Sequence, residues 1–185
     1  MPVSGIAAQQ AKLAALRKAL LNTVPQRLGN DARRFFLTSF RVQGWHDRTV
    51  QAWPKLKAPR TNSKGKVLEN RILKGRGLLM NSIRVLRAEW NSIIVVAGGP
   101  HVPYAKIHNE GGKISGTASV RAFDRRAHMA KTSTGRRMRK EAKVRAFTRR
   151  MNITMPKRQF MGASHELEQI MKKTIVKTVA ETLAK

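Results

Sequence analysis

The feature that most constrains this chain is a cationic segment, residues 113–158, built around a repeated phrase. Val-Arg-Ala-Phe occurs at 120–123 and again at 144–147, and each copy is followed one residue later by Arg-Arg. The segment holds 15 Lys and Arg against 2 acids, a net +13 of the chain's +28. Charge of one sign at this density repels itself unless an anionic partner neutralises it.

The two copies of the phrase predict a long β-hairpin, which we call the basic arm (residues 113–158). The copies would form paired strands, with residues 131–140 as a mobile tip. Phe123 and Phe147 occupy equivalent places in the repeat, so we expect them to face each other across the hairpin and close it. Stacking of the two rings on nucleic-acid bases is the alternative interpretation.

The basic arm is consistent with two kinds of anionic partner. Lys and Arg side chains bind nucleic-acid phosphates without reading sequence, and they also dock onto acidic protein surfaces in large assemblies. A merely solvated loop fits less well, because solvated surfaces mix charges of both signs. The residues that we expect to contact the partner, whether DNA or acidic protein, are Arg125, Arg126, Arg136, Arg137, Arg139, Lys140, Arg149 and Arg150.

The rest of the composition indicates a small intracellular protein. A length of 185 residues with 41% hydrophobic residues suits one domain, or one domain with a long extension. The chain has no cysteine, which excludes disulfides and thiolate metal sites. Neither a signal peptide nor an apolar run of bilayer length is recognisable, so we expect a soluble cytoplasmic product.

The N-terminal third is expected to be helical and then irregular. Apolar residues at helical spacing predict a helix over residues 6–22 that ends at Pro25, and a second over 30–41 that Gly44 closes. Phe35, Phe36 and Phe40 would form the apolar face of the second helix. Residues 45–65 are rich in turn formers and predict a loop, followed by a short helix at 68–73.

The remainder predicts short strands and two helices. Residues 82–90 alternate in polarity, and the β-branched run at 93–97 predicts a strand buried on both faces, with a turn at Asn91-Ser92 between them. A short helix at 103–110 would end at Gly111. The last helix would be capped by Ser164 and bury the face formed by Leu167, Ile170, Met171, Ile175, Val179 and Leu183.

These elements predict the α+β class, with a small antiparallel β-sheet, N-terminal helices, a long C-terminal helix and the basic β-hairpin arm. We expect an N-terminal helical segment over 1–44 and an α+β domain over 45–185. The basic arm, 113–158, would be inserted into that domain.

The sequence contains no recognisable catalytic, cofactor-binding or metal-binding constellation. The ten acids have no spacing typical of a two-carboxylate or metal-dependent site, and the five histidines form no zinc motif. Gly75-Arg76-Gly77 lacks the residues of a phosphate-binding loop. His108 is expected to be a packing histidine that bonds a backbone carbonyl. We therefore expect no enzyme and no cofactor.

The order of several short phrases resembles a known family. Trp-Pro-Lys-Leu at 53–56 precedes Gly-Leu-Leu-Met-Asn-Ser-Ile-Arg-Val at 77–85 and the strand at 93–98. Tyr-Ala-Lys-Ile-His-Asn-Glu-Gly-Gly at 104–112 and Pro-Lys-Arg-Gln-Phe-Met-Gly at 156–162 complete the series. The series resembles the phage virion morphogenesis, or tail completion, family of Mu-type tailed bacteriophages. The similarity covers residues 45–185, interrupted by the basic arm.

The resemblance implies a structural virion protein that completes the tail or neck. Family members form rings, commonly sixfold, that join the tail to the head connector. The expected partners are further copies of the chain and neighbouring neck, connector and tail proteins, and DNA in the channel stays open as another. The expected location is the neck or the head-proximal end of the tail, after assembly in the host cytoplasm. A stand-alone, sequence-nonspecific nucleic-acid-binding protein is the alternative function.

Overall fold

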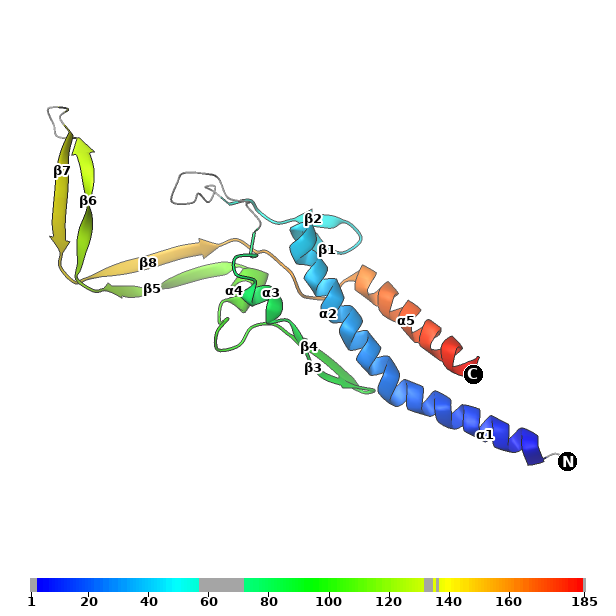
Figure 1. Ribbon diagram of the computed structural model, residues 1–185. Coiled ribbons are helices and arrows are strands. Elements are labelled where there is room, and N and C mark those ends of the chain that lie inside the picture. Colours follow the sequence, from blue (N-terminus) through cyan, green and yellow to red (C-terminus); the bar gives the residue numbers. More distant parts are fainter. Residues whose placement is uncertain (1–2, 57–71, 132–134, 136, 185) are drawn as a thin grey trace. The chain divides into compact units, whose positions relative to one another are not determined.

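The computed structural model describes residues 3–56, 72–131, 135 and 137–184 (Figure 1). Of residues 3–4, 126–131 and 137–141 it describes the backbone alone. The elements confirm the α+β class, with helices at the N-terminus, small antiparallel sheets and a long helix at the C-terminus. Within the described residues no helix combines the length and the apolar character needed to cross a membrane.

The chain divides into two compact units. The core unit comprises Met1–Gly111 and Pro156–Lys185, and the ribbon unit comprises Gly112–Met155. Every residue of the hydrophobic core cluster belongs to the core unit. The ribbon unit holds 13 Lys and Arg against 2 acids, a net +11, which leaves +17 of the total +28 for the core unit.

The N-terminal helices run on from one another. Helix α1 (Val3–Lys18) passes through a π-helical turn (Ala19–Thr23) into α2 (Val24–Val42). The expectation that Pro25 ends a helix is wrong: Pro25 lies in the first turn of α2, where a missing N–H costs little. The wider π turn before it gives the proline ring room that a regular α-helix would not.

Helix α2 is capped at its C-terminus by a glutamine, contrary to the expectation that Gly44 closes it. Gln43 adopts the left-handed conformation (φ 56°), and its Nε2 donates to the carbonyl of Phe40 at 2.8 Å. This side-chain bond helps to stabilise a conformation that residues other than glycine seldom adopt. Gly44 instead begins strand β1 (Gly44–His46).

The aromatic face of α2 organises the core. Phe35, Phe36 and Phe40 are all at least 94% buried, which confirms the face expected from the sequence. Phe40 packs edge-on against Trp53 and tilted against Phe160, with ring centroids 5.5 and 5.3 Å apart. Aromatic contacts of this geometry add to the stabilisation from burial.

Two tryptophans lie in this core because residues 44–52 form a short β-hairpin and not a loop. Strand β1 pairs with β2 (Val50–Ala52), and the hairpin places Trp45 and Trp53 in the interior, each 5% exposed. The expected loop over 45–65 is therefore wrong at its start. The rest of that loop from residue 57, and most of the helix expected at 68–73, lie outside the described residues.

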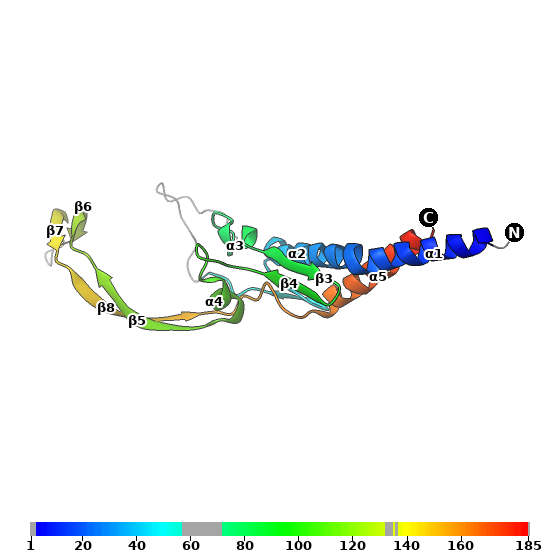
Figure 2. The same cartoon turned by 90° about the horizontal axis from the view of Figure 1, so that it is seen from below.

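A short helix, α3 (Leu78–Asn81), leads into the hairpin of β3 (Arg84–Glu89) and β4 (Ser92–Val96), whose turn is at Trp90-Asn91, one residue before the expected place. The prediction that residues 93–97 are buried on both faces is wrong, since Ile94 is 39% exposed. The reason is that α2 lies against this two-stranded sheet and, among the described residues, no second layer covers it (Figure 2). Gly29 permits the contact, because a Cβ there would lie 3.0 Å from a methyl group of Val85.

The C-terminal helix α5 (His165–Leu183) begins as expected. Ser164 Oγ accepts a hydrogen bond from the backbone of Leu167, and Asp47 Oδ1 accepts one from His165 at 2.7 Å. The His165 N–H holds the pKa of Asp47 below its usual value. The expected apolar face is only partly correct, because Ile175 and Leu183 are exposed whereas Thr178 is 2% exposed.

The ribbon unit consists of two antiparallel ladders. In one, β5 pairs with β8, and in the other β6 pairs with β7. Of the expected mobile tip at 131–140, Lys131 and residues 137–140 are strand, because the second ladder extends as far as the pair Lys131 and Arg137; residues 132–134 and 136 lie outside the described residues. The strand bounds are β5 (Gly112–Val120), β6 (Phe123–Lys131), β7 (Arg137–Val144) and β8 (Phe147–Met155).

We predict that the core unit folds without the ribbon unit. Gly112 and Met155 are cross-strand partners, so their Cα atoms are about 5 Å apart and an Asn-Gly turn can replace residues 113–154. We expect the free energy of unfolding to change by less than about 1 kcal/mol, because the core cluster is left intact. Urea titration followed by circular dichroism measures this, and a non-cooperative transition would contradict it.

Candidate anion-binding surface

The repeated phrase marks the place where the two ladders of the ribbon unit meet. Val120 pairs with Phe147 at the end of the first ladder, and Phe123 pairs with Val144 at the start of the second. The predicted pairing of Phe123 with Phe147 is therefore wrong. Because the strands are antiparallel, two copies of Val-Arg-Ala-Phe meet in opposite directions, and each phenylalanine lies opposite a valine.

The residues expected to contact an anionic partner are distributed over three strands. Arg125 lies in β6 opposite Ala142 and is exposed. Arg149 and Arg150 lie in β8 and are exposed, opposite Ala118 and Thr117 respectively. For four others the structure gives the backbone alone: Arg126 in β6, and Arg137, Arg139 and Lys140 in β7. Arg136 lies outside the described residues.

The ladder of β5 with β8 has one polar and one apolar face. Successive residues of a strand point to opposite faces, and cross-strand partners share a face. The polar face consists of Lys113, Ser115, Thr117, Ser119, Thr148, Arg150, Asn152 and Thr154. The apolar face consists of Gly112, Ile114, Gly116, Ala118, Val120, Phe147, Arg149, Met151, Ile153 and Met155.

Exposure differs between these two faces. Every residue of the polar face is exposed. On the apolar face Ala118, Val120, Met151 and Met155 are half-buried, yet large apolar side chains remain open to solvent. The exposed fractions are 38% for Ile114, 46% for Phe147 and 46% for Ile153.

The polar face contains two cations, five hydroxyl groups, one carboxamide and no acid. The adjacent arginines of β8 are on different faces, Arg150 on the polar face and Arg149 on the apolar one. Arginine, lysine, hydroxyl and amide groups together are the side chains that most often contact nucleic-acid phosphates. The polar face can therefore bind a polyanion without burying an acid beside it.

The hydroxyl and amide residues of the polar face were not among those expected to contact a partner. Their signal was present in the sequence as alternation, with polar residues at 113, 115, 117 and 119 and again at 148, 150, 152 and 154. The charge count drew attention to arginines and lysines alone. Alternation over so short a stretch identifies a face only once the strand register is known.

Two segments of the core unit, residues 104–111 and 156–162, are hydrogen-bonded to each other next to the two ends of the ribbon unit. Asn109 at the end of α4 (Ala105–Glu110) accepts two hydrogen bonds on Oδ1, from the backbone N–H groups of Phe160 at 2.9 Å and Met161 at 3.0 Å. The backbone N–H of Arg158 donates to the carbonyl of His108 at 2.8 Å. Gly111 (φ 75°) permits this approach, because a Cβ there would lie 2.8 Å from the backbone nitrogen of Lys157.

Arg158 is buried and His108 half-buried next to these hydrogen bonds. Arg158 is 6% exposed, and its Nε and Nη2 both donate to the carbonyl of Pro54, at 3.2 and 3.1 Å. Burial lowers the pKa of Arg158. Burial, and secondarily the charge of Arg158, lower the pKa of His108 and favour its neutral form. The expected bond from His108 to a carbonyl is not made by Nδ1, which is buried and has no hydrogen-bond partner among the described residues, while the ring contacts Tyr104 edge-on.

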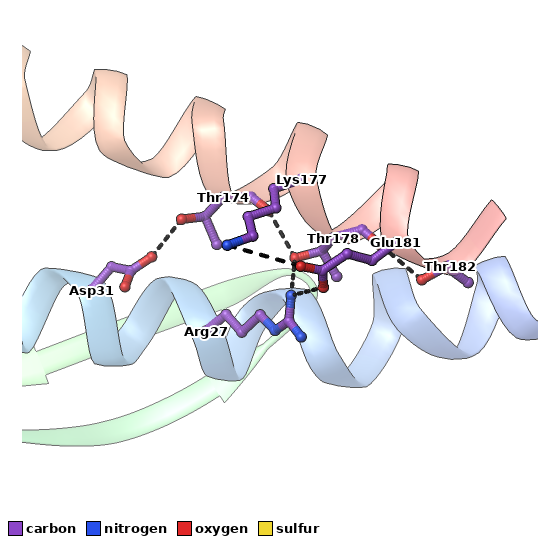
Figure 3. A network of polar contacts seen from close by, with 7 residues as sticks. All are labelled: Arg27, Asp31, Thr174, Lys177, Thr178, Glu181 and Thr182. Atoms are coloured by element: carbon purple, nitrogen blue, oxygen red, sulfur yellow. Dashed lines mark hydrogen bonds and ion pairs between the residues drawn. The ribbon is translucent and has the colours of Figure 1, made fainter. Parts of the chain in front are cut away.

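A second polar cluster joins α2 to α5 (Figure 3). Arg27 donates to Thr178 at 2.9 Å and pairs with Glu181 at 2.7 Å, and Thr174 donates to Asp31 at 2.6 Å. The side chains of Arg27 and Glu181 are each more than 40% exposed, so their ion pair contributes little stability. The cluster holds two helices together and explains why the buried position 178 is a threonine.

Neither cluster suggests catalysis. Within the residues that the structure describes, no three His, Asp or Glu side chains gather where they could hold a metal ion. A cleft of about 600 Å³ between α2, β4 and α5 is lined almost wholly by apolar side chains, with Asn109 as its polar group.

Comparison with known proteins identifies the family. The phage virion morphogenesis family matches residues 6–180. The chain belongs to the phage virion morphogenesis family. It is accordingly a structural or assembly protein of a phage virion. The match spans both units, so the ribbon unit is part of the matched region. No curated protein and no solved structure matches the chain significantly.

Proposed function

We propose that this protein completes the phage tail by forming a ring at the neck, between the tail and the head connector. The family supports a role in virion assembly, and its resemblance to tail-completion proteins suggests the position. In this proposal the chain acts by binding and catalyses no reaction. Its proposed partners are further copies of itself, together with neck, connector and tail proteins.

The observation that carries the proposal is the exposed apolar face of the ribbon unit. A two-stranded ribbon is marginally stable alone, and Ile114, Phe147 and Ile153 keep 38%, 46% and 46% of their surface in contact with water, area that would add stability if it were covered. Contact with a neighbouring virion subunit would cover them. In the ring that we propose, such contacts link successive copies, commonly six in this family, and an anionic partner neutralises the cations.

The size of the assembled protein tests this proposal. Mass photometry of the purified chain, alone and after mixing with purified tails, should show a discrete oligomer in at least one condition, and negative-stain images should show a ring. A chain that stays monomeric at every concentration, with and without tails, would contradict the ring. A defined complex with DNA under those same conditions would support the alternative, a stand-alone nucleic-acid-binding protein.

A further inference from the structure

We propose that the polar face of the β5–β8 ladder binds the phosphate backbone of duplex DNA, with Arg150 as its central cation. The opposite, apolar face takes no part in this contact. The inference rests on the proposed function in one respect only, namely that the ribbon unit has an anionic partner. The partner that we infer is duplex DNA, and the surface that contacts it is the polar face.

The chemistry of the polar face suits phosphate. Lys113 and Arg150 supply charge, and the five hydroxyls and the amide of Asn152 supply hydrogen-bond donors that need no countercharge. Half or more of protein–DNA hydrogen bonds are made to phosphate and sugar, and these side-chain types are among their usual donors. An acid on this face would repel phosphate, and the face has none.

The separation of the two faces favours DNA over an acidic protein as the partner. The centre of a protein–protein interface is enriched in aromatic and apolar side chains and depleted of charge. On this ladder the large apolar groups, Phe147, Met151 and Ile153, all lie on the face opposite to Arg150. The polar face therefore lacks the apolar centre that a protein partner would require, whereas a phosphate backbone requires none.

The same separation favours duplex over single-stranded nucleic acid. Proteins that bind single strands stack bases on aromatic rings. The polar face carries no aromatic residue, and Phe147 lies on the other side of the ladder. Contacts to phosphate alone, without stacking, are typical of backbone binding to a duplex.

The ladder has the dimensions for such a contact. Its nine residue pairs run from Gly112↔Met155 to Val120↔Phe147 without a register shift. At about 3.4 Å per residue it extends for roughly 27 Å, enough to follow several phosphates. A two-stranded ribbon is also narrow enough to enter the DNA major groove.

Two adjacent arginines provide a matched test. Arg149→Gln and Arg150→Gln remove the same charge from neighbouring exposed residues of one strand, but from different faces. The binding of the full chain to a fluorescein-labelled 30-bp duplex is measured by anisotropy over a range of KCl concentrations. Arg150→Lys, which keeps the charge, completes the set, and thermal unfolding followed by circular dichroism shows whether each variant is folded.

We expect Arg150→Gln to reduce the salt dependence, the slope of log K against log[KCl], by about 0.9, the value for one lost phosphate contact. This change in slope corresponds to an affinity of the variant about eightfold lower than that of the wild type at 0.1 M salt. Arg149→Gln should lower the affinity less than twofold, and Arg150→Lys should retain the slope of the wild type. Equal losses in the two glutamine variants, or no binding of the duplex by the wild-type chain, would overturn the proposal.

The outcome is separable from that of the proposed ring. Mass photometry on the same samples, without DNA, reports whether each variant still forms the oligomer. A chain that forms rings but shows no difference between Arg149→Gln and Arg150→Gln contradicts the DNA-binding face and leaves the ring intact. A chain that never forms a ring but shows the difference contradicts the ring and supports the DNA-binding face.

Discussion

Replacement of Phe160 by alanine should lower the free energy of unfolding by about 3–5 kcal/mol, the largest loss expected from any single substitution described here. The ring is 1% exposed and packs against Phe40, which in turn packs against Trp53. Its removal leaves a cavity between α2 and the segment that precedes α5. Urea denaturation followed by tryptophan fluorescence measures the loss.

Phe147→Ala is the matched control for this prediction. It is the same substitution on a ring that is 46% exposed on the ribbon unit. Its effect on the unfolding of the core unit should be within about 0.5 kcal/mol, because nothing in the core cluster changes. Similar losses for Phe147→Ala and Phe160→Ala would contradict the division of the chain into a packed core unit and an open ribbon.

Replacement of Asn109 by leucine should lower the free energy of unfolding by about 2–4 kcal/mol. The side chain has nearly the same shape, but the backbone N–H groups of Phe160 and Met161 lose the oxygen that accepts from both. A buried donor left without a partner costs about 1–3 kcal/mol. Thermal and urea unfolding measure this loss.

Asn109→Asp distinguishes the acceptor from the shape of the side chain. A carboxylate keeps an oxygen at the same place, so both backbone bonds can persist and the loss should stay below about 1 kcal/mol. If aspartate and leucine were equally destabilising, the two hydrogen bonds would not be the reason that asparagine stands at this position.

Local signals predicted the elements whose stability is local. The Ser164 cap, the aromatic face of α2 and the end of α4 at Gly111 all depend on residues within a few positions of one another. Pro25 was misjudged because the π turn before it is not encoded in an evident pattern. Residues 93–97 were expected to be buried on both faces because a β-branched run shows hydrophobicity but not the number of layers that cover it.

In the ribbon unit, too, the sequence alone does not show which residues share a face. Counting charges identified the segment and the arginines, but it assigned Arg149 and Arg150 the same role. The strand register places them on opposite faces, and it reveals the hydroxyl groups that accompany Arg150. A shift of one residue in the pairing would exchange the faces, and the charge count would not change.

The sequence by itself determined the α+β class, the excess of positive charge and the family to which the chain belongs, because composition, periodicity and short phrases in order are properties of the chain alone. Only the tertiary structure decided that the repeated phrase joins two ladders, that Asn109 ties 104–112 to 156–162, and which face of the ribbon is polar. Each of these depends on which distant residues pair, and that choice is made by the packing and hydrogen bonding of the whole fold.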